Sequence, residues 1–229
     1  MWQRILEEAP DFFTYYNLIF LGEALLATFL LSAIGCLIGF CAGFFLAVTR
    51  RTISWPLMPM RFICVIFTEL FRRTPFLVTL MMVFFVFQLA KINISLFTVA
   101  LISVCFIATA FIAEIIRGGF ESVHRTQWDA AEAMNMPLLQ TLRYVIVPQA
   151  WKIILPPVFS FFILFIKDTA LASQIGVVEL TYAGKVLNNK GFSAALVFGS
   201  ILVLYFALSY PLARFGIWME KKLAPARNH

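Results

Sequence analysis

Charged residues are scarce in this chain. Of its 229 residues only 13% are Asp, Glu, Lys or Arg, whereas 62% are hydrophobic. A soluble domain of this size needs a polar surface that such a composition does not supply. Three long intervals contain no charged residue at all, namely 24–49, 92–113 and 191–213. The composition therefore excludes an ordinary soluble protein and indicates a protein embedded in lipid.

The apolar intervals are long enough to cross a bilayer, because about 20 residues of α-helix span its hydrocarbon core. They lack the apolar–polar alternation of barrel strands, and only helices or closed barrels satisfy their backbone in lipid. We therefore predict an all-α integral membrane protein with five transmembrane helices in a single domain, 1–229. The predicted spans are 17–48, 56–90 (broken near 74–75), 95–116, 153–176 and 192–218, with a cytoplasmic loop over 117–152.

Lys and Arg are distributed unevenly between the two ends of these spans. Cytoplasmic segments of membrane proteins carry an excess of both residues. With the N-terminus outside, thirteen basic residues fall inside and four outside, and Lys167 lies within a span. The sequence thus predicts an external N-terminus and a cytoplasmic C-terminus. The inner set is Arg50, Arg51, Arg61, Arg72, Arg73, Arg117, Arg125, Arg143, Lys152, Arg214, Lys221, Lys222 and Arg227; the outer set is Arg4, Lys91, Lys185 and Lys190.

Residues typical of metal or nucleotide chemistry are rare. The four cysteines have no C-x-x-C spacing and lie in apolar segments, as buried thiols do. Only His124 and His229 are present, both outside the predicted spans, and no G-x-x-x-x-G-K-[ST] motif occurs. We predict no metal, no cofactor and no catalytic residue in this chain. An intramembrane hydrolase is a disfavoured alternative, because Glu69, Glu114 and Asp168 each have a cation nearby.

The predicted cytoplasmic loop contains a polar, helix-forming run. Gln127–Met134 is rich in Ala, Glu and Met, Asn135 suits a left-handed helix end, and Pro137 suits the start of a second helix. Pro148 is expected to end that helix, and Pro156–Pro157 to open the next span. The pattern alone favours a helix pair packed on the membrane surface or on its own bundle. Docking into a groove of a soluble partner is the second interpretation.

Two charge pairs lie near the ends of predicted spans. Glu69 and Arg72, and likewise Glu114 and Arg117, are three residues apart and share a helix face. Charges in lipid are costly and need a partner or a function. Structural pairing is favoured for Glu114 and Arg117. For Glu69 and Arg72 both a structural and a functional role stay open, because a half-helix with a positive end begins after Thr74.

Lys167 and Asp168 interrupt the fourth predicted span. An amino-acid zwitterion needs an acceptor for its ammonium group, which Asp168 and the neighbouring Thr169 can supply; alternatively, Lys167 neutralises Asp168. We predict a translocation-path site formed by Glu69, Arg72, Thr74, Pro75, Asp168 and Thr169.

Small residues recur every four positions along the first span, at Gly35, Gly39, Gly43 and Ala47. Such a stripe allows another helix to approach closely. Packing within this chain is favoured over packing against a second copy.

Four stretches, in chain order, resemble one known family. ELFRRTP (69–75) is similar to its E-x-x-R-G-T-P motif, and AEIIRGGFESV (113–123) to A-E-I-x-R-G-G. The run D-A-A-x-x-x-N, followed by QTLRYVIVPQA and LPP, resembles the E-A-A-x-x-x-G loop, and IKDTALASQIGVVELT (166–181) resembles K-D-T-S-L-x-S-x-I-G-x-x-E-L. The family is the permease subunits of bacterial ABC importers for polar amino acids, of the histidine/glutamine type. Asp129 and Asn135 depart from the loop's Glu and Gly, and Arg73 from the Gly of R-G-T-P.

The resemblance implies a type I ABC permease in the bacterial inner membrane, with a periplasmic N-terminus. The first helix of the loop is then the coupling helix that docks onto an ATPase. Implied partners are two ABC ATPase subunits that bind ATP and Mg²⁺, a second permease (identical or a paralogue), a periplasmic amino-acid-binding protein and the lipid bilayer, but no nucleic acid. A permease for a related small polar solute, such as an opine, and a non-catalytic membrane anchor are the alternatives. The implied coupling residues are Asp129, Ala130, Ala131, Asn135, Arg143 and Pro148.

Overall fold

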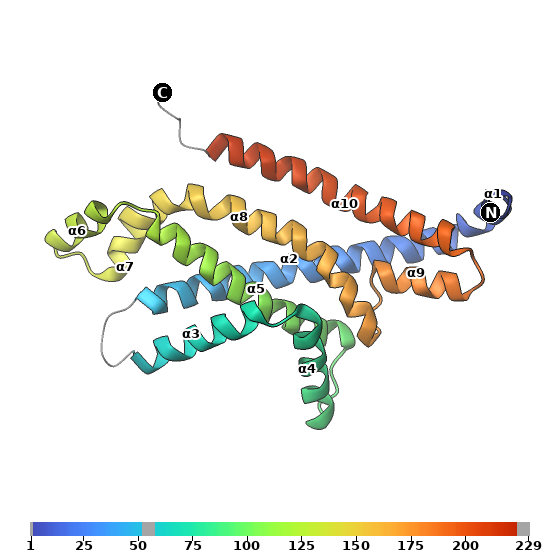
Figure 1. Cartoon of the computed structure of the whole chain (residues 1–229), viewed down its shortest axis with the longest axis horizontal. Coiled ribbons are helices and arrows are strands. Elements are labelled where there is room, and N and C mark those ends of the chain that lie inside the picture. The colour runs from blue at the N-terminus through green and yellow to red at the C-terminus, as the bar shows by residue number, and fades with distance from the viewer. Residues whose placement is uncertain (1, 52–57, 224–229) are drawn as a thin grey trace. The chain divides into compact units, whose positions relative to one another are not determined.

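The computed structural model describes residues 2–51 and 58–223, and none of these residues forms a β-strand. The predicted all-α class is therefore confirmed. The start of the second predicted span at residue 56, and Arg227 and His229, lie outside the described residues. The α-helices are α1 (Trp2–Phe12), α2 (Tyr15–Arg51), α3 (Met58–Arg73), α4 (Phe76–Leu89), α5 (Leu96–Glu121), α6 (Arg125–Ala133), α7 (Leu138–Thr141), α8 (Val147–Asp168), α9 (Leu180–Asn189) and α10 (Ala194–Leu223) (Figure 1).

The described part contains four helical segments long and apolar enough to cross a membrane: α2, α5, the stretch Leu138–Ile175, and α10. The pair α3 and α4 makes a fifth span when it is counted as one. Helix α3 ends at Arg73 and α4 begins at Phe76. The predicted break at Thr74–Pro75 is thus confirmed, because Pro75 lacks the amide that would continue the helix and restricts the residue before it.

The helix leading into the fourth predicted span begins before residue 153, because Pro148 does not end a helix. The chain stays helical through α7, a π-helical turn η2 (Leu142–Ile146), α8 and a 3₁₀ segment η3 (Thr169–Ile175). The wider π-turn directly before Pro148 accommodates a residue that cannot donate to the helix. The side chain of Gln149 adds a further bond to this turn, since its Nε2 donates to the Val145 carbonyl oxygen at 2.8 Å. Pro156 and Pro157 likewise lie inside α8 and do not open it.

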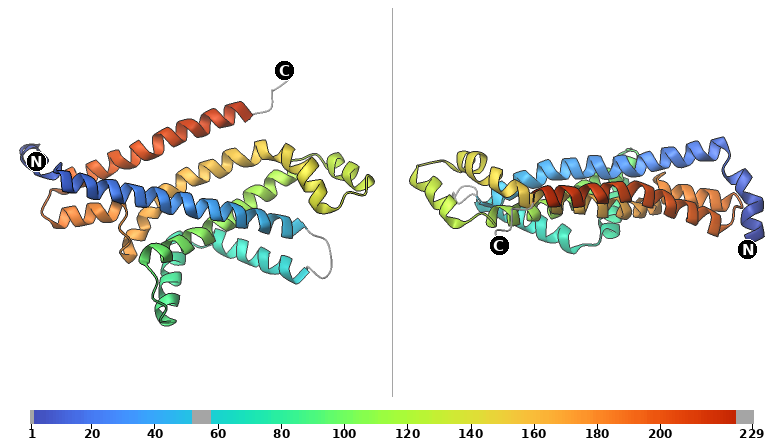
Figure 2. Two further views of the ribbon diagram at one scale, coloured as in Figure 1. Left: turned by 180° about the vertical axis from the view of Figure 1, so that it is seen from behind. Right: turned by 90° about the horizontal axis from the view of Figure 1, so that it is seen from above.

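The described residues form two compact units, and each is considered by itself. Unit 1 contains the described residues up to Gly35, together with Phe76–Val104 and Phe162–Leu212. In this unit α9 packs against α2 and α10 (Figure 2). Buried Leu180, Ala183 and Leu187 of α9 share one apolar cluster with side chains of the other two helices and with Phe12 of α1. Those side chains are Leu21 and Ala24 of α2 and Val197 and Ile201 of α10.

Unit 2 contains Cys36–Pro75, Cys105–Phe161 and the described residues from Ala213 onward. Its helices α2 and α5 approach each other closely at the stripe of small residues. A Cβ atom added to Gly39 would lie 2.5 Å from the Cβ of Ala108, and one added to Gly43 would lie 2.9 Å from the backbone nitrogen of Ala113. The prediction that this stripe packs within the chain is therefore confirmed.

Candidate functional site

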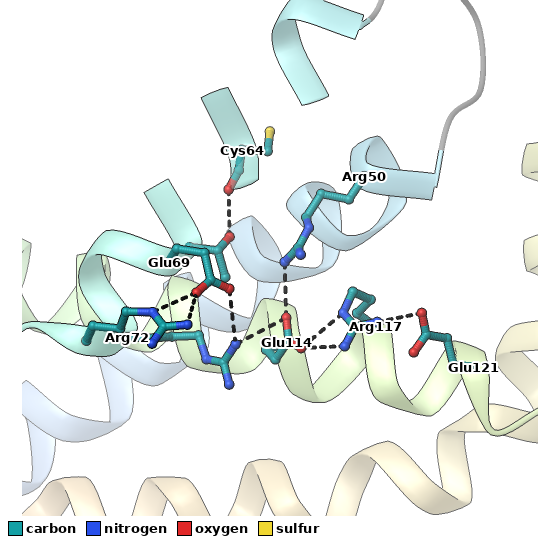
Figure 3. A network of polar contacts seen from close by, with 9 residues as sticks. Arg50, Cys64, Glu69, Arg72, Glu114, Arg117 and Glu121 are labelled. Carbon is teal, nitrogen blue, oxygen red and sulfur yellow. Dashed lines mark hydrogen bonds and ion pairs between the residues drawn. The ribbon is translucent and has the colours of Figure 1, made fainter. Parts of the chain in front are cut away.

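Glu114 of α5 is the centre of a charged network in unit 2 (Figure 3). Its Oε2 accepts a hydrogen bond from Nη1 of Arg50 on α2 at 3.1 Å and lies 3.4 Å from Nη1 of Arg72 on α3. Its Oε1 accepts from Nε of Arg117, one turn along α5, at 3.0 Å. The predicted pair of Glu114 and Arg117 is confirmed. The carboxylate also joins three helices, which the spacing did not predict.

Arg72 links Glu114 to a second carboxylate, that of Glu69 on α3. Its Nη1 lies 3.8 Å from Oε1 of Glu69, whose Oε2 is 2.7 Å from Nη2 of Arg73. The Thr74 hydroxyl donates to the Leu70 carbonyl at 2.8 Å, and the Thr74 amide donates to the same oxygen at 3.1 Å. Pro75 is exposed between the two helices. The structure thus brings Glu69 and Arg72 together, with both side chains already paired.

Guanidinium groups outnumber carboxylates in this network. Four Arg against three Glu leave one positive charge in excess. The network therefore offers no unpaired carboxylate to a cation, but it has positive charge to spare for an anionic group. Its members are Arg50, Arg72, Arg73, Arg117, Glu69, Glu114 and Glu121.

Asp168 and Thr169 belong to unit 1, at the junction of α8 and η3. Thr169 is fully buried, and its hydroxyl donates to the Ile166 carbonyl at 2.7 Å. Asp168 is half-buried and does not cap η3 with its side chain. Within the described residues it forms no ion pair, so Lys167, which is exposed, does not neutralise it by direct contact. A path shared by these residues and the Glu69 region stays a prediction.

The loop predicted to be cytoplasmic forms the expected helix–turn–helix. Helix α6 begins after His124, whose Nδ1 accepts a hydrogen bond from the Thr126 amide. Asn135 has a φ of 54°, which confirms the left-handed turn, and Pro137 stands immediately before α7. Most of the predicted coupling residues are exposed, whereas Ala131 is completely buried and offers no side chain to a partner. The exposed ones are Asp129, Ala130, Asn135, Arg143 and Pro148.

Glu179 in unit 1 is a polar residue for which we predicted no role. Its side chain is buried and caps α9 by accepting hydrogen bonds from the amides of Thr181 at 3.0 Å and Tyr182 at 2.8 Å. The Tyr205 hydroxyl of α10 donates to the same carboxylate at 2.9 Å. Burial raises the pKa of Glu179 above its usual value. Because Glu is not a preferred N-cap residue, its residue type did not predict this role, although Glu179 is the Glu of the matched G-x-x-E-L stretch.

Apolar spans, a broken second span and an exposed helical loop together define a membrane-embedded transport subunit. Residues 39–217 match the family described as binding-protein-dependent transport system inner membrane component, and the chain belongs to this family. The predicted family and its inner-membrane location are thereby confirmed.

Individual relatives extend over most of the chain. The chain is 32% identical over 197 residues to the probable amino-acid ABC transporter permease protein YckA of Bacillus subtilis (strain 168), covering 86% of each protein. It is 31% identical over 191 residues to the glutamine transport system permease protein GlnP of Escherichia coli (strain K12), covering 82% of this chain and 84% of that one.

Solved structures agree with the fold. A crystal structure of an amino acid ABC transporter with histidines superposes with a TM-score of 0.82 at 27% identity, covering 90% of this chain and 95% of the other. An inward-facing structure of the MetNI methionine ABC transporter has a TM-score of 0.76 at 22% identity and covers 93% of this chain and all of the other, which supports the fold alone. The chain therefore has the type I ABC permease fold.

Proposed function

We propose that this chain is the permease subunit of an ATP-driven importer for polar amino acids. The observation that carries the proposal is the match to YckA and GlnP over more than four fifths of both chains, since both relatives are named as amino-acid or glutamine permeases. The complete importer contains two ATPase subunits that bind ATP and Mg²⁺, a second permease and a periplasmic amino-acid-binding protein. The chain's N-terminus is periplasmic and its C-terminus cytoplasmic.

The α6 helix is the element that receives force from the ATPase. Its exposed face carries Asp129, whose side chain is 61% exposed and only weakly paired with Arg125 at 3.9 Å. A carboxylate this accessible is available to donors on a partner's surface. Ala131 on the opposite face holds α6 against its own unit, so a push on α6 is passed on to the membrane helices.

The substrate's two charges need opposite partners along the path. Asp168 supplies an acceptor for the ammonium group, because it is only half-buried and no ion pair occupies it among the described residues. The excess guanidinium of the Glu69–Glu114 network supplies a donor for the carboxylate. Neither group selects a particular amino-acid side chain, which agrees with a receptor that chooses the substrate before delivery.

The coupling role is tested by reversing one exposed charge. Asp129→Arg replaces a carboxylate with a guanidinium on the outer face of α6, and it should lower transport and ATPase co-purification by at least about tenfold. Glu7→Arg, the same change on exposed α1, is the matched control and should leave both unchanged. Normal transport by Asp129→Arg in reconstituted complexes would show that α6 does not dock.

The substrate role of Asp168 needs a separate test. Asp168→Asn keeps the shape of the side chain but removes its charge, so it should weaken substrate uptake and substrate-stimulated ATPase activity while basal ATPase activity persists. Lys167→Gln changes the neighbouring exposed charge and serves as the control. If Asp168→Asn retains both activities, Asp168 does not contact the substrate.

A further inference from the structure

The inner face of α6 contacts two membrane helices that the chain does not join to it directly. The guanidinium of Arg51, at the end of α2, lies over the Trp128 ring, with its Cζ 4.2 Å from the ring centroid. Gln149 of α8 donates from Nε2 to Oε1 of Gln127 at 3.2 Å. Neighbouring residues of α6 are therefore held by the ends of two different helices, and the contacting residues all belong to unit 2.

These contacts involve Gln127 and Trp128, which share a face of α6 with buried Ala131. Trp128 is half-buried and Ala131, three residues later, is completely buried, whereas Asp129 and Ala130 are exposed. Residues three and four apart share a helix face, so one face of α6 is held and the other is free. A partner that displaces or rotates α6 must therefore also move Arg51 and Gln149, which hold this face.

The contact of Arg51 with Trp128 differs from the other connections of α6. The chain itself connects α6 to α5 and, through α7 and η2, to α8. Helix α2 is not next to α6 along the chain, and the contact of Arg51 with Trp128 joins the two helices. A cavity of about 940 Å³ adjoins Arg51, Trp128 and Asp129. The Trp128 ring therefore borders open space on one side and contacts the Arg51 guanidinium on one face.

We propose that Arg51 and Trp128 are positioning residues that transmit motion of the coupling helix to α2, with Gln127 and Gln149 doing the same for α8. This proposal rests on the proposed function, since it presupposes that α6 receives force from an ATPase. An Arg over an indole ring suits the task because the attraction persists while the two planes slide and it does not depend on one hydrogen-bond geometry.

The test measures how much substrate is imported for each ATP hydrolysed, in reconstituted complexes with all subunits present. Trp128→Leu removes the ring face, and Arg51→Gln removes the cation. Each should keep ATPase co-purification and basal ATPase activity while lowering the import-to-hydrolysis ratio by about fivefold, a typical change when a coupling free energy is reduced. Trp128→Phe and Arg51→Lys retain a weaker form of the contact and should keep most of the ratio.

Further variants separate this proposal from a structural defect. Glu7→Gln changes an exposed charge on α1 and should behave as the wild type. The double variant Arg51→Gln/Trp128→Leu should be no worse than either single variant, because both remove one contact. Gln127→Ala should lower the ratio less, since it leaves the bond from Gln149 to Val145 in place.

Three results would overturn the proposal. An unchanged ratio in Trp128→Leu would show that the contact transmits nothing. Additive losses in the double variant would show that the two residues act separately, and loss of ATPase co-purification would place Trp128 in the docking face. The proposed function fails in a different way, when Asp129→Arg binds its ATPase and transports normally, so the two failures are distinguishable.

Discussion

Glu114 in unit 2 and Glu179 in unit 1 are two carboxylates in the same apolar chain, and their surroundings satisfy them differently. Glu114 is held by guanidinium groups from α2, α3 and α5. Glu179 is held by two backbone amides and a tyrosine hydroxyl, all of them uncharged. The first site needs a negative charge to balance its neighbours, whereas the second needs only oxygen atoms that accept hydrogen bonds.

This difference predicts opposite responses to the same substitution. Replacing Glu by Gln removes the charge but keeps the size and one acceptor oxygen. At Glu114 the change leaves three guanidinium groups facing an uncharged amide in a place largely removed from water. At Glu179 the remaining oxygen can still accept from the Thr181 amide and the Tyr205 hydroxyl, as Oε2 does, and only the Tyr182 amide loses its acceptor. Charge is therefore the structural requirement of one site, and hydrogen-bond acceptance that of the other.

Glu114→Gln should have the largest effect of the variants considered. Removing one partner of a buried ion pair costs about 3–5 kcal/mol, and the lower end applies because the Glu114 side chain retains 21% exposure. The free energy of unfolding, measured by titration with a denaturing detergent, checks this value. Glu121→Gln is the control, since that side chain is 50% exposed and its loss should cost less than about 1 kcal/mol. Equal costs for the two variants would refute the network's structural role.

Glu179→Ala should have the next largest effect. It removes the cap of α9 and leaves the partly buried Tyr205 hydroxyl without its carboxylate, at a cost of about 2 kcal/mol. Glu179→Gln, measured in the same titration, should cost about 1 kcal/mol or less because an acceptor remains. If Glu179→Gln destabilises the protein as much as Glu114→Gln does, the claim that only Glu114 requires a negative charge is wrong.

Tyr205→Phe tests the remaining donor at Glu179. The hydroxyl is 2.9 Å from the carboxylate and 3.1 Å from the Thr181 hydroxyl, so its loss should cost about 1 kcal/mol. Tyr210→Phe on the same helix is a matched control, because that residue is 51% exposed and its change should be nearly neutral. A neutral result for Tyr205→Phe would mean that the two amides alone satisfy Glu179.

Features set by local chemistry were predictable from the sequence. The break at Thr74–Pro75, the left-handed Asn135 and the pair of Glu114 with Arg117 all follow from residues a few positions apart. Pro148 was predicted wrongly, because the rule that proline ends a helix neglects the π-turn that precedes it.

Contacts between distant segments were not predictable from spacing. Arg50 with Glu114, Arg51 with Trp128, and Tyr205 with Glu179 each join residues on different helices. A single sequence shows that these residues are polar or aromatic and lie near the ends of apolar runs. Which of them meet depends on how the helices pack, and that is set by many apolar contacts acting together. The candidate site was therefore predictable as a set of residue types but not as a network.

The smallest predicted effect concerns pH and a third carboxylate, Glu8 of α1. The Ser193 amide donates to it at 2.7 Å and Arg4 pairs with it, which together lower its pKa from 4.5 to about 2. A depressed pKa contributes stability above pH 4.5 that is lost as the pH falls towards 2. Glu179 has the opposite sign, because its raised pKa makes its contribution greatest at low pH and weaker as the pH rises through the folded-state value. Glu8→Gln should therefore reduce the fall of the unfolding temperature with decreasing pH below 4.5. Glu7→Gln, at an exposed position, should leave that fall unchanged. If the unfolding temperatures of the wild type and Glu8→Gln fall in parallel, the contact of α1 with Ser193 does not stabilise the fold.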